Sequence, residues 1–391
     1  MYRNRKIFLV VGLLALICII FNRCINSKAG NDPRGPLYAG SASCIGCHKD
    51  VAGSYAHTNH FKTSGKPVDS ILEKNFNTAG HISYYTDGSM VTLEKTREYI
   101  YQVHLKNGNR LHAEKIDFAI GSGEKAQTYA YWKDGQLLQL PLTFFAGIRS
   151  WTNSPGYPTD QAFYDRVILS RCFECHASFV EKTDVQAGSL QLSEKLAEQT
   201  IVPGIDCERC HGAAAEHVAY QQKNPSVKEA KFITSIKSLT RKQQLDLCST
   251  CHSGNDLDVQ RTLFAFQPGD TLANYYFPHF GEGKPNPDVH GKQMQLLQQS
   301  KCFAGSQMTC GTCHNTHVAE NDPKIFVAKC MSCHQSSKHA VQQQTAVKNC
   351  IDCHMPLQAS KALDFNNGKE RKRIPYLLRT HRIGVYLESV K

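Results

Sequence analysis

Long apolar runs are almost absent from this 391-residue chain. Its one run, from Ile7 to Phe21, spans about 15 residues, which is short for a membrane helix, and no later segment could cross a bilayer. The chain is 20% charged and 41% hydrophobic, with only 27 glycines and 15 prolines. This composition excludes a polytopic membrane protein, a collagen-like chain and a wholly disordered one.

Motifs for nucleotide binding, hydrolysis and nucleic-acid binding are also missing. Residues 121–125 (Gly-Ser-Gly-Glu-Lys) resemble a phosphate-binding loop but lack its full spacing, so they predict a connecting loop. The formal net charge of +11 would suit an acidic partner such as nucleic acid. The cysteines described below give that charge another explanation.

Residues 1–29 have the pattern of an export signal, with a basic patch at residues 3–6 before the apolar run. Small residues near its end predict cleavage after Ala29. An uncleaved membrane anchor and a lipoprotein modified at Cys18 or Cys24 remain alternatives. All three alternatives place the rest of the chain outside the cytoplasmic membrane. The protein is then either released into the periplasm or anchored to a membrane through its N-terminal segment.

Cysteine and histidine are the residues that carry chemistry here, with 17 and 18 copies. Fourteen of the 15 cysteines after the leader fall into seven Cys-x-x-Cys-His motifs, numbered one to seven in chain order. The motif cysteines are Cys44, Cys47, Cys172, Cys175, Cys207, Cys210, Cys248, Cys251, Cys310, Cys313, Cys330, Cys333, Cys350 and Cys353. The motif histidines are His48, His176, His211, His252, His314, His334 and His354.

This motif is the attachment signature of c-type haem. Two thiols form thioethers with the haem vinyl groups, and the adjacent histidine becomes the proximal iron ligand. Zinc sites and thioredoxin-like pairs use Cys-x-x-Cys without requiring the histidine, and disulfides do not explain it either. The sequence therefore predicts seven covalently attached haems, with Cys302 left over as a buried structural thiol.

Eleven further histidines could supply distal iron ligands. The stronger candidates lie close to motifs or near the end of the chain: His60, His217, His290, His317, His339 and His381. The weaker candidates are His57, which competes with His60, and His279. His217 stands about 240° around a predicted helix from His211, so we expect it to serve a neighbouring haem. His81, His104 and His112 lie in a haem-free stretch and are expected to be ordinary side chains.

The motifs divide the chain unevenly. We expect a leader (1–29), a first haem segment (30–75), a β-rich insert (76–158) and a hexahaem region (159–391). Six motifs in the last region leave too little chain for a separate fold around each haem, so the stacked haems should form the core. The predicted fold is mainly α and irregular, with the β-rich insert between the first and second motifs.

Local signals support that division. Asp-Gly or Asn-Gly turns at residues 87–88, 107–108 and 134–135 predict three β-hairpins in the insert. Asp322-Pro323 and the pair Thr240 and Gln243 predict helix starts that lead into the sixth and fourth motifs. Residues 160–170 are expected to run as a helix into the second motif.

Four segments resemble those of exported multihaem cytochromes related to the tetrahaem cytochrome that accepts electrons from hydroxylamine oxidoreductase, grouped with cytochrome c-prime-like sequences. The matching segments are residues 43–48 followed by His60, residues 204–212 followed by His217, residues 308–317 and residues 350–356. The resemblance implies stacked haem pairs and mainly bis-histidine ligation, with distal ligands from remote motifs. This chain differs from the tetrahaem member in having seven motifs and the insert.

The sequence thus predicts an exported heptahaem c-type cytochrome that relays electrons between redox partner proteins, such as a membrane quinol-linked complex or another multihaem cytochrome. One alternative is an oxidoreductase acting on a small nitrogen or sulfur compound at a five-coordinate haem. Another is a docking role for the β-rich insert. No nucleic-acid partner is expected, because haem propionates would bring the reduced mature protein to a net charge of about −8.

Overall fold

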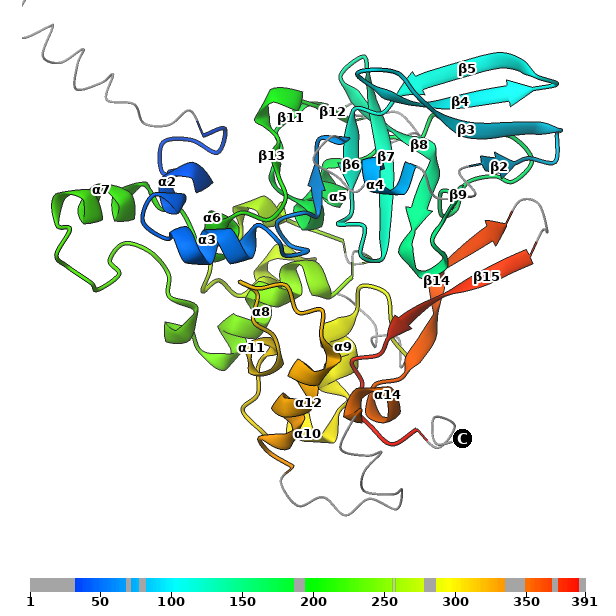
Figure 1. The fold of residues 1–391 in the computed structure, drawn as a ribbon. Coiled ribbons are helices and arrows are strands. Elements are labelled where there is room, and N and C mark those ends of the chain that lie inside the picture. The colour runs from blue at the N-terminus through cyan, green and yellow to red at the C-terminus, as the bar shows by residue number, and fades with distance from the viewer. Residues whose placement is uncertain are drawn as a thin grey trace, which may run out of the picture.

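The structure is a computed structural model and describes residues 32–67, 72–76, 82–185, 194–254, 256, 258–277, 286–334, 349–367 and 372–386. The candidate ligands His279 and His339 and the leader lie outside the described residues. About 31% of the described residues are helical and 27% lie in strands. Two larger antiparallel sheets form one end of the molecule, and short helices form the other (Figure 1).

Nine strands form the two larger sheets. The four-stranded sheet has the order β2-β3-β4-β5, and the five-stranded sheet has the order β1-β6-β7-β8-β9. Their bounds are β1 Ser64–Gly65, β2 Ile82–Tyr84, β3 Ser89–Lys95, β4 Ile100–Lys106, β5 Asn109–Lys115, β6 Phe118–Ile120, β7 Ala126–Lys133, β8 Gln136–Phe145 and β9 Ser150–Asn153. The three predicted hairpins are present as β2-β3, β4-β5 and β7-β8. Asn107 and Asp134 adopt the positive φ that such turns require.

The core of this end lies between the two sheets. Val91, Tyr129, Leu140 and Trp151 are buried together, and Tyr129 stacks on Trp151 with ring centroids 5.1 Å apart. The buried Gln102 side chain joins the sheets by donating to the Leu142 carbonyl oxygen and accepting from its N–H. A second cluster joins the sheets to the helices, because Phe118 of β6 packs on Phe173 of the second motif.

Twelve α-helices, most of them one to three turns long, are found among the described residues. They are α2 Ser41–Ile45, α3 Lys49–Tyr55, α4 Leu72–Phe76, α5 Ser170–His176, α6 Cys207–His211, α7 Ala215–Lys223, α8 Arg241–His252, α9 Gln293–Gln298, α10 Lys301–Ala304, α11 Cys310–Cys313, α12 Pro323–Met331 and α14 Cys350–His354. The predicted starts of α8 and α12 are confirmed: Thr240 and Gln243 form a capping box, and Asp322 caps α12 before Pro323.

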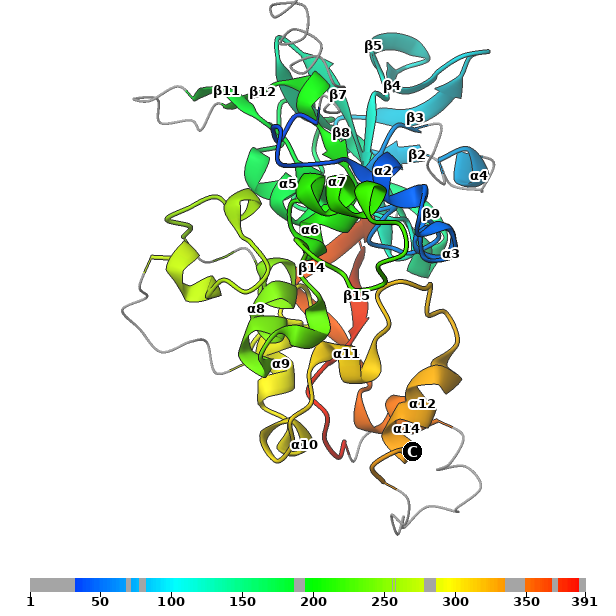
Figure 2. The ribbon, with the colours of Figure 1, turned by 90° about the vertical axis from the view of Figure 1, so that its left-hand side faces the viewer.

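The expectation of a mainly α fold is wrong. Three further antiparallel ribbons lie outside the predicted insert: β10 (Ala177–Phe179) with β13 (Val202–Pro203), β11 (Lys182–Val185) with β12 (Glu194–Leu196), and β14 (Leu357–Asn367) with β15 (Lys372–Arg379). The β14-β15 ribbon runs from α14 back to the sheets (Figures 1 and 2), where Phe365 packs on Phe145. The fold is therefore β-rich, with strands in the predicted hexahaem region as well as in the insert.

The helix predicted over residues 160–170 is also wrong. The Gln139 N–H donates to the Arg166 carbonyl, the Ile168 N–H donates to the Leu137 carbonyl, and Val167 forms a β-bridge with Leu138. These contacts hold the segment extended along β8, so helix α5 begins only at Ser170.

Candidate functional site

Each of the seven motifs is built on a helical turn. Helices α5, α6 and α14 contain a complete motif, and α8 ends with one. The first, fifth and sixth motifs keep the same turn, since the N–H groups of His48, His314 and His334 donate to the carbonyl oxygens of Cys44, Cys310 and Cys330. Residues i, i+3 and i+4 of a helical turn share one face. Both thiols and the imidazole of a motif therefore point to the same side.

Four motif histidines face a histidine from another part of the chain. The ring centroids are 6.5 Å apart for His48 and His217, 6.0 Å for His252 and His60, 5.9 Å for His211 and His317, and 6.3 Å for His314 and His381. The ring planes are within 30° of parallel in three pairs and nearly perpendicular, at 85°, in the pair of His60 and His252.

This separation matches the space that one iron needs between two imidazoles. A metal–nitrogen bond is about 2 Å long and the coordinating nitrogen lies about 1 Å from its ring centre, so two axial imidazoles have centroids about 6 Å apart. Aromatic rings in direct contact have centroids about 4.5–7 Å apart as well, so the assignment to an iron also rests on the motif histidine that each pair contains. The four pairs therefore fit the axial ligands of a haem iron.

His290 also lies near a motif histidine, His176. Burial lowers the pKa of His176, and the neighbouring His290 lowers this pKa further. Burial also lowers the pKa of His290. Burial likewise lowers the pKa of His252, and that of His381 to about 4. These imidazoles are therefore neutral at neutral pH, which is the form that binds metal.

Several motif and candidate histidines place their Nδ1 atom in a hydrogen bond. The Nδ1–H group of His211 donates to the Thr234 carbonyl oxygen (3.0 Å), and that of His217 donates to the Lys231 carbonyl oxygen (2.8 Å). The Nδ1–H group of His354 donates to the Gly384 carbonyl oxygen (2.8 Å). The Nδ1 atom of His176 is 2.9 Å from Thr63 Oγ1, and that of His314 is 3.0 Å from Glu320 Oε2. A hydrogen bond at Nδ1 orients the ring and leaves Nε2 for a metal.

Thiols of different motifs also meet. Hydrogen bonding with Cys207 raises the pKa of Cys44, and hydrogen bonding with Cys251 raises the pKa of Cys175. Cys248 and Cys310 interact in the same way. The first motif thus lies beside the third, the second beside the fourth, and the fourth beside the fifth. Groups attached to these thiols would lie side by side.

Residues between the motif cysteines join one motif to another. Glu174 of the second motif accepts from the Leu263 N–H (2.9 Å), the Thr262 hydroxyl (2.7 Å) and Arg171 (2.5 Å). Arg209 of the third motif donates to the carbonyl oxygens of Leu263 and Glu174. The second and third motifs are therefore fixed to each other by polar contacts as well as by packing.

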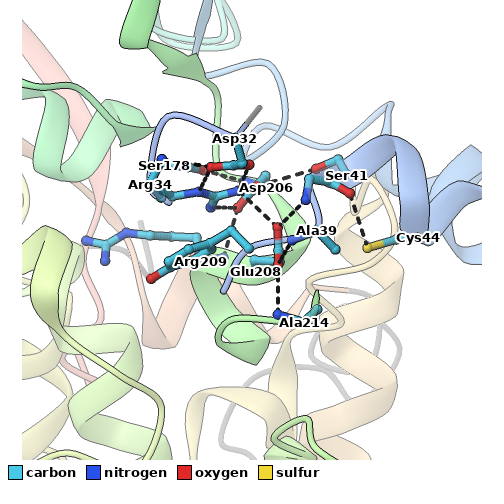
Figure 3. Close-up of polar contacts among 12 residues, drawn as sticks. Asp32, Arg34, Ala39, Ser41, Cys44, Ser178, Asp206, Glu208, Arg209 and Ala214 are labelled. Atoms are coloured by element: carbon cyan, nitrogen blue, oxygen red, sulfur yellow. Dashed lines mark hydrogen bonds and ion pairs between the residues drawn. The ribbon is translucent and has the colours of Figure 1, made fainter. Parts of the chain in front are cut away.

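A buried charged cluster underlies the first and third motifs (Figure 3). The guanidinium of Arg34 pairs with Asp32 (2.9 Å), Asp206 (2.7 Å) and Glu208 (3.0 Å). We name these four residues the Arg34 cluster. Sequence reasoning missed it; the only signal was a pair of carboxylates flanking Cys207 in the third motif.

The remaining histidine and cysteine candidates lie elsewhere. His57 is exposed near the end of α3, and His104 and His112 face each other across β4 and β5, away from the motifs. Cys302 is half-buried and not fully buried as expected. Among the described residues, no group of three His, Cys, Asp or Glu side chains converges as a metal site. Within that same part of the chain, no helix combines the length and hydrophobicity needed to cross a membrane.

Residues 157–212, which contain the second and third motifs, match the family model described as cytochrome c554 and c-prime. No curated protein shows a significant match. The crystal structure of outer cell wall cytochrome OcwA aligns with a TM-score of 0.49 and 17% identity, over 87% of this chain and 82% of that chain. The family match and the motifs support a multihaem c-type cytochrome with covalently bound haem that functions in electron transfer.

Proposed function

We propose that this chain is an exported heptahaem c-type cytochrome that carries electrons between redox proteins. The observation that carries the proposal is the set of opposed imidazoles, which come from segments far apart in the sequence and are spaced for one iron. The match to cytochrome c554 and c-prime supports a relationship to the tetrahaem electron-accepting cytochromes.

In this proposal the motif histidines are the proximal ligands of seven haems. His217, His290, His317, His60 and His381 are the distal ligands at the first five motifs, in that order. His339, His279 and His57 remain the candidates for the sixth and seventh motifs. Each of these five distal ligands follows a different motif from the one it faces, so ligation would also tie the motifs together.

When bound, haem supplies reversible one-electron chemistry, and its potential depends on axial ligands, hydrogen bonds and burial. The residues of the chain hold the imidazoles neutral, orient them through Nδ1 and bring neighbouring attachment sites together. These roles suit a carrier that changes little in structure between its oxidised and reduced states.

Intact-mass spectrometry of the exported protein, combined with EPR of the oxidised form, tests the proposal. We expect the polypeptide mass plus seven haems, and spectra dominated by low-spin iron. Fewer than seven haems would refute the heptahaem assignment. A high-spin haem that binds and turns over a small nitrogen or sulfur compound would favour the enzyme alternative.

The proposed partners are an electron donor and an electron acceptor, such as a membrane quinol-linked complex or another multihaem cytochrome. The proposed location is the periplasm or the cell surface, with the N-terminal segment acting as a cleaved signal or an anchor. Subcellular fractionation with N-terminal sequencing of the mature protein distinguishes the two roles of that segment.

A further inference from the structure

The Arg34 cluster is an unusually buried group of charges. The exposed fractions of the side chains are 5% for Arg34, 6% for Asp32, 5% for Asp206 and 0% for Glu208. Isolated charges are rarely buried to this extent, because desolvation is costly unless each ion is paired and hydrogen-bonded.

Backbone donors complete the pairing of the carboxylates. Glu208 accepts from the N–H groups of Ala39 (2.9 Å), Gly40 (2.9 Å) and Ala214 (2.8 Å), and Asp206 accepts from the Arg209 N–H (2.9 Å). Burial raises the pKa of Asp32, but the hydrogen bonds and charge of Arg34 outweigh it and hold this pKa below its usual range. The ion pairs and backbone donors thus hold the cluster in a fixed arrangement.

Three carboxylates against one guanidinium leave the cluster with a net charge of −2. Arg209, the cation of the third motif, directs its guanidinium away from the cluster to carbonyl oxygens of Leu263 and Glu174 (Figure 3). Lys49 and Lys62, near the first motif, are exposed, so water and salt screen their charges. The cluster itself therefore keeps its excess negative charge, while Arg209 places a positive charge near Cys210 of the third motif.

This negative charge lies beside two attachment sites. Asp206 and Glu208 flank Cys207, and both carboxylates help to raise the pKa of Cys44 in the first motif, after the larger effects of Cys207 and burial. At the second motif, by contrast, Glu174 is balanced by Arg171, and at the seventh Asp352 is balanced by Arg379.

We propose that the Arg34 cluster lowers the reduction potentials of the two haems attached at the first and third motifs. The inference rests on the proposed function, because it requires haem at both motifs. Reduction adds one electron from an external redox protein to ferric iron, giving ferrous iron, with no bond made or broken. A fixed negative charge nearby opposes this added electron and favours the ferric form. This pair becomes the more reducing end of the array.

Spectroelectrochemical titration of the holoprotein tests the proposal with Asp206→Asn, which removes one negative charge at nearly constant shape. Its matched control is Asp134→Asn in the exposed β7-β8 turn, where asparagine tolerates the same positive φ. We expect a positive shift in the low-potential components of Asp206→Asn and an unchanged titration for Asp134→Asn. Unshifted low-potential components in an Asp206→Asn protein with full haem content would overturn the proposal.

If Asp206→Asn assembles with less haem than the wild type, Asp32→Asn decides the question. It removes the same charge but leaves the backbone bonds of the third motif intact, and the same two outcomes apply. The intact mass of the wild type distinguishes a failure of the heptahaem assignment from a failure of the proposed effect of the Arg34 cluster. Missing haem at the first or third motif refutes the proposed function, whereas full haem with unshifted potentials refutes only the role of the cluster.

Discussion

His48 and His217 hold their imidazole rings 19° from parallel with centroids 6.5 Å apart. The two residues belong to different segments: His48 ends the first motif and His217 lies on α7, just after the third. Nδ1–H of His217 donates to the Lys231 carbonyl oxygen, which orients the ring and leaves Nε2 for a metal. This relationship leads to the first prediction.

Replacing His217 with alanine should open the sixth position of one haem iron, because the distal nitrogen is lost. We expect one of the seven haems to convert from low-spin to high-spin, while total haem stays at the wild-type level. EPR with spin integration measures the change. His112→Ala on β5 is the matched control and should leave all signals unaltered. A His217→Ala protein with an unchanged low-spin population would show that His217 is no ligand.

Gly204→Ala should destabilise the fold both by backbone strain and by a steric clash. Gly204 has φ +66°, and an added Cβ would overlap the carbonyl oxygen of Phe61, next to His60. We expect a loss of about 1–3 kcal/mol in the free energy of unfolding, with altered spectra from the haem that His60 serves.

The control for that variant is Gly88→Ala, where φ is +82° and the added Cβ would meet no atom within 4 Å. Strain alone should cost about 1 kcal/mol and leave the haem spectra intact. Thermal unfolding and visible absorption measure both effects. Equal losses in the two variants would contradict the role given to the close approach at Phe61.

Glu174→Gln should weaken the hydrogen bonds that connect the second motif to residues 262–263. The buried carboxylate accepts from Arg171, Thr262 and Leu263, and the amide can replace only part of this pattern. We expect a loss of about 1–3 kcal/mol, read from chemical unfolding. Glu124 is exposed, so Glu124→Gln should change the free energy of unfolding little. An equally small effect of Glu174→Gln would show that the hydrogen bonds of Glu174 do not stabilise the fold.

Asp87 should make the free energy of unfolding depend on pH in the acidic range. Hydrogen bonds from Ser89 lower the pKa of Asp87 to about 2 from its ordinary 3.8. A lowered folded-state pKa stabilises the protein above the ordinary value, and this contribution disappears as the pH falls to the folded value. The stability difference between wild type and Asp87→Asn should therefore be constant above about pH 5 and shrink as the pH falls toward about 2. Urea unfolding at several pH values measures it; a difference that persists at pH 2 would contradict the assignment.

Local patterns carried much of the sequence-based prediction. The hairpin turns at Asn107 and Asp134 and the cap at Thr240 depend on neighbouring residues alone, so they could be inferred directly. The segment before Ser170 has helical periodicity, but pairing with β8 overrides it. The β14-β15 ribbon was missed because its register depends on packing against Phe145.

The site shows the same limit. The attachment cysteines can be identified from the Cys-x-x-Cys-His spacing alone, because this motif involves only neighbouring residues. The partner of each imidazole and the insertion of Arg34 beneath the third motif depend on contacts between distant segments, and no spacing rule specifies these. The ring of His217 lies opposite that of His48. The continuous helix expected between His211 and His217 is wrong, because α6 ends at His211, Gly212 has φ +82° and α7 begins at Ala215.

An iron anomalous-difference map from crystals of the holoprotein tests the central claim most directly. The account predicts seven iron peaks, five of them midway between the rings of His48 and His217, His176 and His290, His211 and His317, His252 and His60, and His314 and His381. Iron peaks away from these pairs, or fewer than seven peaks at full haem content, would contradict it.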